Sequence, residues 1–178
     1  MKKEDIKYEI SVKSLYLNNE RYRFLYKKIW DINKKTIVCI AFNPSKGDLF
    51  FNDMTLDRLT YEFQNKYGGI EVLNLFSIMQ TKLSSNYCIK NENINKRYIM
   101  MYIRNRKDYD FFIGWGNSFN YYPNTYVNEG KERKGEIENL FTKLNMKSNI
   151  YCYRSQWGKA LHPSRYNSTW KVKKYFLR

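Results

Sequence analysis

Short apolar runs alternate along this chain with longer segments in which apolar residues recur every three or four positions. Residues 36–42 (TIVCIAF) carry no polar side chain after Thr36 and are rich in β-branched residues, a pattern typical of a strand that is covered on both faces. Residues 70–75, 109–113 and 149–153 form similar runs. We therefore predict four buried strands.

Segments with helical periodicity separate these strands. In residues 55–67 the apolar side chains recur at helical spacing, and two glycines follow, as at many helix ends. The same periodicity predicts helices at residues 92–106 and 131–144. Alternating strands and helices imply right-handed crossovers. We therefore predict a three-layer α/β/α fold, in which helices cover both faces of a central four-stranded, mostly parallel sheet.

One further segment has the pattern of a half-buried strand. Residues 21–30 (RYRFLYKKIW) alternate large rings with basic residues, which places Tyr22, Phe24 and Tyr26 on one face. We predict that this segment is an edge strand of an N-terminal β-hairpin.

The composition fits one folded unit. The chain has 178 residues, of which 43% are hydrophobic and 18% aromatic, and this is enough apolar material for one core, so we predict a single domain at residues 1–178. The longest apolar runs are far shorter than the roughly 20 residues of a membrane-spanning helix. The amino terminus is charged and is not followed by an apolar segment of signal-peptide length. We therefore expect a cytoplasmic protein that does not bind membranes.

The charge balance points to a polyanionic partner. Lys and Arg number 32 against 17 Asp and Glu, which gives a net charge of +15. Each basic group near a phosphate adds salt-dependent affinity, so the excess favours nucleic acid, DNA rather than RNA, or a nucleotide. The alternative is a basic surface that is merely solvated and reflects AT-rich coding.

Metal chemistry is not expected. Cys39, Cys88 and Cys152 show no CxxC spacing, two of them lie in apolar runs that predict buried strands, and His162 is the sole histidine, so the closely spaced ligand pairs of a structural zinc site are missing. We predict no metal and no cofactor, and we interpret the cysteines as small core residues.

Uncharged hydrogen-bonding residues follow the predicted strands. In open α/β sheets the ligand crevice lies beyond the carboxyl ends of the strands. Taken singly, each motif has an ordinary explanation as a turn, a cap or a structural histidine. Their coincidence at one sheet edge predicts a site, formed by residues 43–48 (NPSKGD), 74–77 (NLFS), 114–117 (GWGN) and 162–164 (HPS).

With these motifs the chain resembles domain-of-unknown-function family 1643, which is similar in core layout to the uracil-DNA glycosylase superfamily. The resemblance implies a uracil-DNA glycosylase-like fold and covers about residues 21–166. It rests on elements that occur in the family's order: Tyr22-Arg23, Trp30-Asp31, Asn43-Pro44-Ser45, Asp53 with Thr55-Leu56-Asp57-Arg58, Gly69 to Phe76, Trp115-Gly116-Asn117 and His162-Pro163.

The resemblance also implies roles for individual residues. Asn43 would position the attacking water, Asn74 would read the edge of the base, and His162 would stabilise the departing base. Asp53 is a further catalytic candidate, with helix capping as the alternative. The base would contact Phe42, Phe76, Trp115 and Asn117, and the phosphates would contact Ser45, Lys46, Lys159, Ser164 and Arg165.

These groups suit cleavage of an N-glycosidic bond, because neutral donors can stabilise the base as it leaves as an anion. We therefore expect a nucleobase-recognising, glycosylase-like protein that hydrolyses this bond in DNA or in a nucleotide. Two features depart from the pattern: Asn43 cannot act as a general base, and the histidine turn continues with Arg165-Tyr166-Asn167 instead of an apolar wedge. The alternatives are a non-enzymatic protein that sequesters a nucleotide or nucleic acid in the same pocket, and a basic aromatic surface that binds nucleic acid without a pocket.

Overall fold

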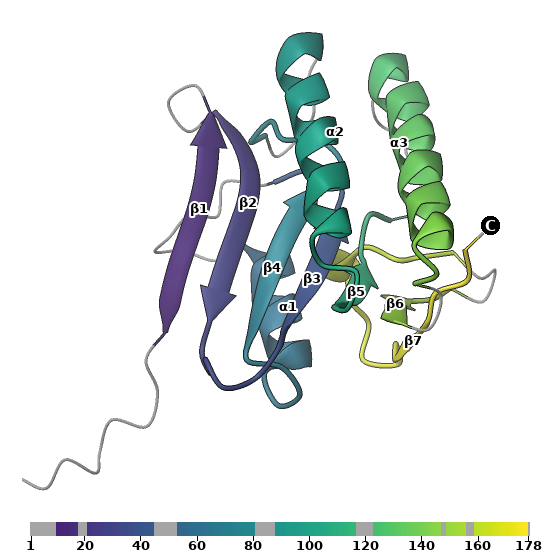
Figure 1. The fold of residues 1–178 in the computed structure, drawn as a ribbon. Helices are drawn as coiled ribbons and strands as arrows, with labels where there is room; N and C mark the ends of the chain where they lie inside the picture. Colours follow the sequence, from purple (N-terminus) through teal and green to yellow (C-terminus); the bar gives the residue numbers. More distant parts are fainter. Residues whose placement is uncertain are drawn as a thin grey trace, which may run out of the picture.

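In the residues that the structure describes, a mixed sheet of seven strands and three α-helices make up an α/β fold (Figure 1). The computed structural model describes residues 10–17, 21–44, 53–80, 88–116, 123–146, 149–155 and 159–177. The strands lie in the order β1-β2-β4-β3-β5-β6-β7. Their bounds are β1 (Ser11–Leu17), β2 (Tyr22–Ile29), β3 (Thr36–Ala41), β4 (Gly69–Asn74), β5 (Asp110–Ile113), β6 (Ile150–Tyr153) and β7 (Val172–Lys174).

The four strands expected from the sequence form the parallel centre of this sheet. β3 pairs in parallel with β4 and β5, and β5 pairs in parallel with β6. The prediction of a four-stranded sheet is nevertheless wrong in number, because β1, β2 and β7 extend it with antiparallel pairs. β1 is at most half-buried and β7 has only three residues, so neither carries the continuous apolar run that marks a buried strand.

β2 is an interior strand, which corrects the prediction that it lies at the edge. It pairs with β1 on one side and with β4 on the other, and a register shift between Leu15 and Tyr16 interrupts its pairing with β1. The expected single aromatic face is also wrong. Tyr22 and Phe24 pack in one hydrophobic cluster and Tyr26 packs in the other.

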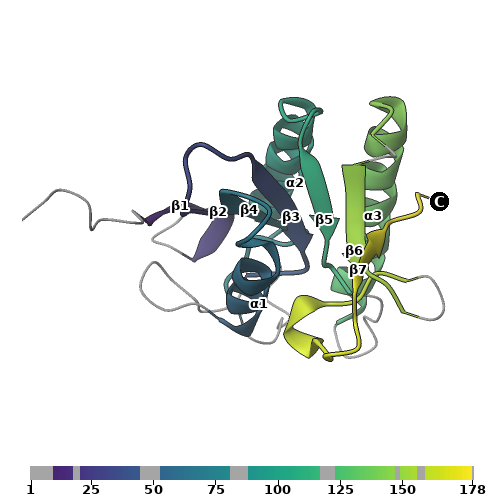
Figure 2. The ribbon, with the colours of Figure 1, turned by 90° about the horizontal axis from the view of Figure 1, so that it is seen from below.

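The helices cover the sheet unequally. α1 (Met54–Phe63) lies on one face, whereas α2 (Ile89–Arg104) and α3 (Asn124–Lys143) lie side by side on the other (Figure 2). Alternate residues of β3 show this division, because Ile37 and Cys39 pack with α1, and Val38 packs in the cluster that holds α2 and α3. Two separate apolar cores therefore flank the sheet.

α3 begins at Asn124, earlier than the predicted residue 131. Of its first six residues only Tyr126 is buried, so the apolar periodicity is too weak there to indicate a helix.

The cysteines are free thiols, and both Cys39 and Cys152 are buried in the cores. In the described part of the chain, no cluster of three or more His, Cys, Asp or Glu side chains is arranged to hold a metal ion. Nor does any described helix have the length and apolarity to span a bilayer.

Candidate functional site

The parallel strands bring their carboxyl ends to one edge of the sheet, which we call the carboxyl edge. Ala41 is directly opposite Asn74 in the pairing of β3 with β4. The pairing continues past the strands, because the Phe76 amide donates to the Phe42 carbonyl at 2.9 Å and the Gly114 amide donates to the Ile40 carbonyl at 2.8 Å. The segments after β3, β4 and β5 therefore start side by side.

Asn43 is half-buried and its side chain is anchored to the backbone. Nδ2 donates to the Gln80 carbonyl at 2.6 Å and to the Pro44 carbonyl at 3.2 Å. Both amide hydrogens are thus engaged, and Oδ1 is left as an acceptor. The anchoring fixes the direction of this oxygen, which can orient a water molecule but cannot remove its proton.

Asn74 is the last residue of β4 and is only 3% exposed. It follows Ile70 and Val72 at alternate positions of the strand, and both of these pack with α1, so its side chain points to that face. Its side-chain amide makes no hydrogen bond to another described residue. No side-chain atom of Asn74 is among the fully buried unpaired atoms of the described residues, so this amide is available to a hydrogen bond from a bound molecule.

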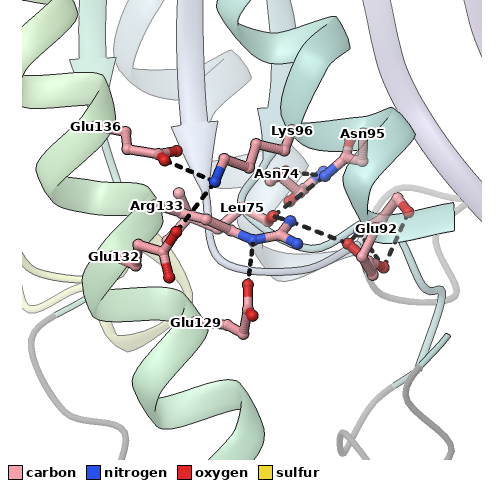
Figure 3. A network of polar contacts seen from close by, with 10 residues as sticks. Asn74, Leu75, Glu92, Asn95, Lys96, Glu129, Glu132, Arg133 and Glu136 are labelled. Atoms are coloured by element: carbon pink, nitrogen blue, oxygen red, sulfur yellow. Dashed lines mark hydrogen bonds and ion pairs between the residues drawn. The ribbon is translucent and has the colours of Figure 1, made fainter. Parts of the chain in front are cut away.

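A buried polar network holds the backbone on which Asn74 lies (Figure 3). Asn95 Nδ2 donates to the Asn74 carbonyl at 3.0 Å and to the Leu75 carbonyl at 3.1 Å. Arg133 Nη1 donates to the same Leu75 carbonyl at 2.7 Å and lies 3.3 Å from Glu92 Oε2. Arg133, Glu92 and Asn95 are each at most 1% exposed. The network therefore ties α2 and α3 to the carboxyl edge.

Glu92 extends this network to the segment after β4. Its carboxylate accepts from the Ser77 amide at 3.0 Å, from Ser77 Oγ at 3.0 Å and from the Ile78 amide at 3.2 Å. Burial raises the pKa of Glu92 above its ordinary value, against the lowering effects of Arg133 and of these donors. The sequence analysis missed this residue, although Glu92, Asn95 and Ile99 share one helix face and Ile99 is apolar.

His162 precedes the short 3₁₀ helix η2 (Pro163–Arg165) and caps it. Nδ1 accepts from the Ser164 amide at 3.3 Å and lies 2.8 Å from Ser164 Oγ. Since a backbone N–H can only donate, Nδ1 is the acceptor and Nε2 carries the proton. The ring therefore offers a donor at Nε2.

The imidazole is neutral at pH 7. Burial lowers the pKa of His162 to about 4, with the Asp53 carboxylate opposing the shift and the charges of Arg165 and Lys134 adding to it.

Two glycines leave room for the histidine turn, residues 162–164, to pack against the segment that follows β5. A Cβ atom at Gly114 would lie 3.0 Å from ring atoms of Pro163, and one at Gly116 would lie 3.4 Å from the Cβ of His162. Gly116 also has a positive φ of 75°, which favours glycine. The expectation that these motifs meet at the carboxyl edge therefore holds for 114–116 with 162–163.

Lys134 is a second group near the histidine that the sequence analysis missed. Its Nζ donates to the Gly116 carbonyl at 2.7 Å and lies 5.4 Å from the centroid of the Trp115 ring. Burial lowers the pKa of Lys134 to about 7, although the Glu138 carboxylate opposes the shift. Among 32 Lys and Arg residues, no pattern in the sequence sets this lysine apart.

Asp53 caps α1, the alternative that the sequence left open. One of its carboxylate oxygens accepts from the Leu56 amide at 2.8 Å, which satisfies a donor at the helix start. Its charge also acts on His162, so the capping residue lies near enough to the histidine to influence its protonation.

The three aromatic candidates are core residues. The rings of Phe42 and Phe76 pack edge to face at 5.3 Å, and Trp115 packs edge to face on Tyr175 at 6.0 Å. All three are at most 4% exposed, which leaves little ring surface for a base to stack on. Their role in base stacking stays a prediction.

The remaining candidates are the phosphate-binding residues and Asn117. Ser164 is engaged with His162, whereas Arg165 and Lys159 are exposed. Ser45, Lys46 and Asn117 lie outside the described residues.

The fold and this edge together define an α/β protein in which the histidine turn lies against the segment that follows the parallel strand β5. The chain belongs to the family described as proteins of unknown function, DUF1643, whose model matches residues 23–164.

Two solved structures are distantly similar. One is a protein assigned as a carboxylesterase from Lactobacillus plantarum WCFS1, with 10% identity, a TM-score of 0.37 and coverage of 87% of this chain and 56% of that chain. The other is a protein assigned as a CIB-like hydrolase from Thermoplasma acidophilum, with 13% identity, a TM-score of 0.29 and coverage of 60% and 52%. This chain thus spans about half the length of each, and at these TM-scores neither assigns it an activity. No curated protein matches the chain.

Proposed function

We propose that this protein binds a nucleobase at the carboxyl edge of its sheet and hydrolyses the N-glycosidic bond that joins the base to its sugar, in DNA or in a nucleotide. A sheet and helices arranged as in uracil-DNA glycosylases are part of this proposal. The observation that carries it is His162, a neutral imidazole with its proton on Nε2, held against Gly116 at the carboxyl edge.

The chemistry follows from the departing group. When an N-glycosidic bond breaks, the base leaves with the bonding electrons, and negative charge spreads over its ring nitrogens and, in bases such as uracil, onto an exocyclic carbonyl oxygen. A fixed neutral donor such as Nε2–H of His162 stabilises this charge without the cost of burying a cation. Asn74 supplies a buried amide that can pair with the base edge, and the network of Glu92, Asn95 and Arg133 holds its backbone.

The water-positioning step is assigned to Asn43. Its Oδ1, oriented by the two backbone contacts of Nδ2, accepts a hydrogen bond from the attacking water. Because an amide takes no proton, the proton is assigned to another base at the carboxyl edge, and Asp53 is the described carboxylate whose charge reaches His162.

The test is release of free base. The purified protein is incubated with nucleosides and with single- and double-stranded DNA that carries uracil or another modified base, and released base is quantified by chromatography. His162→Ala should lower the release rate by about 100- to 1000-fold, the usual effect of removing one stabilising donor. Asn43→Ala and Asn74→Ala should also lower it.

Asn65→Ala serves as the matched control, because Asn65 is exposed in the turn that follows α1 and lies outside the site. Thermal unfolding of each variant separates lost chemistry from lost folding. Release that persists unchanged in the folded His162→Ala variant would contradict the proposed mechanism.

A second candidate function is non-enzymatic sequestration of a nucleotide or nucleic acid in the same site. The backbone-anchored amide at Asn43, where an acid would activate water better, favours it. Tight binding that requires Asn74 and His162, with no base released from any of these substrates, would select this function.

A further inference from the structure

A groove of about 660 Å³ lies between α2 and α3, on the face of the sheet opposite α1. None of the candidate residues of the carboxyl edge lines it. Met100 and Leu140 contribute apolar surface, and the charged part of the lining consists of Lys96, Arg97, Arg104, Glu136 and Lys143.

The helix geometry explains why these residues share the groove. Arg97, Met100 and Arg104 are spaced by three and four residues along α2, so they lie on one stripe of that helix. Leu140 and Lys143 are spaced by three on α3 and face the same groove. The stripe on α2 runs from Asn93 to Arg104, a length of about 17 Å at 1.5 Å per residue.

The lining carries an excess of positive charge. Four cations stand against one carboxylate, a balance of 4 − 1 = +3. Lys96 is compensated, because its Nζ lies 2.6 Å from Glu136 Oε1 and 3.2 Å from Glu132 Oε1 (Figure 3). Arg97, Arg104 and Lys143 are exposed and form no ion pair with any acidic side chain in the described ranges. Their charges are therefore available to a ligand.

Helix ends account for part of this arrangement. Arg104 and Lys143 lie in the last turns of their helices, where a cation interacts favourably with the helix dipole. Arg97 lies in the middle of α2, where the dipole offers no such stabilisation. The helix dipole thus accounts for the positions of Arg104 and Lys143 but not for that of Arg97, which is therefore the strongest evidence of the three for a ligand in the groove.

We propose that this groove binds the phosphodiester backbone of one strand of nucleic acid. Arg97 and Arg104 are about 10 Å apart along α2 and Lys143 lies across the groove on α3, so three uncompensated cations along one groove match a ligand that carries several negative charges in a row. No aromatic ring lines the groove among the described residues, so it lacks a surface on which bases stack. Contacts of this kind position a strand without reading its sequence. The inference is independent of base cleavage at the carboxyl edge.

The test measures binding alone. A fluorescein-labelled 12-nucleotide single strand of DNA is titrated with the protein, and anisotropy gives the affinity between 0.05 and 0.5 M salt. The triple variant Arg97→Gln, Arg104→Gln, Lys143→Gln should bind about 100-fold more weakly at 0.1 M salt. The slope of log affinity against log salt should become shallower by about 2, since each phosphate contact on a single strand contributes about 0.7.

A matched triple variant, Lys35→Gln, Lys66→Gln, Lys173→Gln, removes the same charge from exposed positions outside the groove and should leave the slope within about 0.5 of the original. Arg97→Gln alone should weaken binding about 5-fold, which gives a second reading if the triple variant folds poorly. A strand with uncharged methylphosphonate linkages should not bind.

Three results would overturn the inference: equal loss of affinity in both triple variants, an unchanged slope in the groove variant, or tight binding of the methylphosphonate strand. Because none of these measurements depends on released base, the groove and the carboxyl edge are tested separately.

Discussion

Near the start of β4, Glu71 is surrounded by Lys27, Tyr102 and Arg106, whereas Glu92, next to the end of the same strand, faces one arginine and a set of neutral donors. Both glutamates are 1% exposed. Burial raises the pKa of Glu71, but its three partners outweigh this and hold the pKa below its ordinary value. At Glu92 burial prevails and the pKa is raised.

The difference extends to the other groups at the carboxyl edge. Burial lowers the pKa of both His162 and Lys134, so three titratable groups there are shifted toward their neutral forms. Glu71, by contrast, is held in its charged form. Such shifts concentrate at functional sites because chemistry needs groups that can exchange protons or donate without charge. The comparison thus separates a structural ion cluster from a candidate site.

Removing Arg133 should have the largest effect. Arg133→Met leaves Glu92 buried without its cation, and we expect the free energy of unfolding to fall by about 3–5 kcal/mol, measured by urea denaturation. Adding Glu92→Gln should restore part of the loss, since no unpaired charge then remains. A double variant that is less stable than Arg133→Met would show that the unpaired charge of Glu92 does not cause the loss of stability.

The histidine should make stability depend on pH. The folded pKa of His162, about 4, lies below the ordinary histidine value of 6.5, so the unfolded chain binds the proton first as the pH falls. As the pH falls from 6.5 to 4, the free energy of unfolding should therefore decrease by about 3 kcal/mol. His162→Gln should remove this part of the decline, measured by urea denaturation at each pH. Parallel profiles for both proteins would show that the imidazole is not held neutral.

Glu71→Gln should destabilise by about 1–3 kcal/mol at pH 7, because a neutral amide replaces the acceptor of three donors. The pKa of Glu71 is lowered in the folded state, so its contribution is present above the unfolded pKa and is lost as the pH falls through the folded pKa. Denaturation at pH 7 and at pH 3 should therefore show the gap between the two proteins narrowing. A gap that stays constant would indicate that charge is not involved.

The smallest effect is expected at a glycine. Gly116→Ala places a Cβ on a residue with φ of 75°, at a cost of about 1–2 kcal/mol. Gly135→Ala is the matched control, because its Cβ would meet no atom within 4 Å and alanine favours a helix by about 1 kcal/mol. The midpoint temperature of thermal unfolding should fall for Gly116→Ala and rise for Gly135→Ala. A change in the same direction for both variants would contradict the backbone argument.

The sequence predicted those elements whose pattern is set by burial on both faces. β3, β4, β5 and β6 carry nearly continuous apolar runs, and their carboxyl ends, with Asn43 and Asn74, follow from the parallel arrangement. β1 and β7 were not predicted, because half-exposed and very short strands have no such run.

The buried charged residues of α3 could not be predicted for a different reason. Nothing local separates Arg133 or Lys134 from the exposed Lys131 and Lys143 of the same helix. The burial of the first two depends on segments distant in sequence, Leu75 for Arg133 and Gly116 for Lys134. Asp53 shows the converse case. Its capping role is local and could be foreseen from its position before α1, whereas its influence on His162 depends on the tertiary fold.

The buried pair of Glu92 and Arg133 also constrains how this sequence can change over evolutionary time. An intermediate that keeps only one partner holds an uncompensated charge in the protein interior, so stepwise replacement passes through a poorly folded ancestor. Descendants of one ancestral chain should therefore retain both residues or exchange both, and the two positions should covary although 41 residues separate them along the chain.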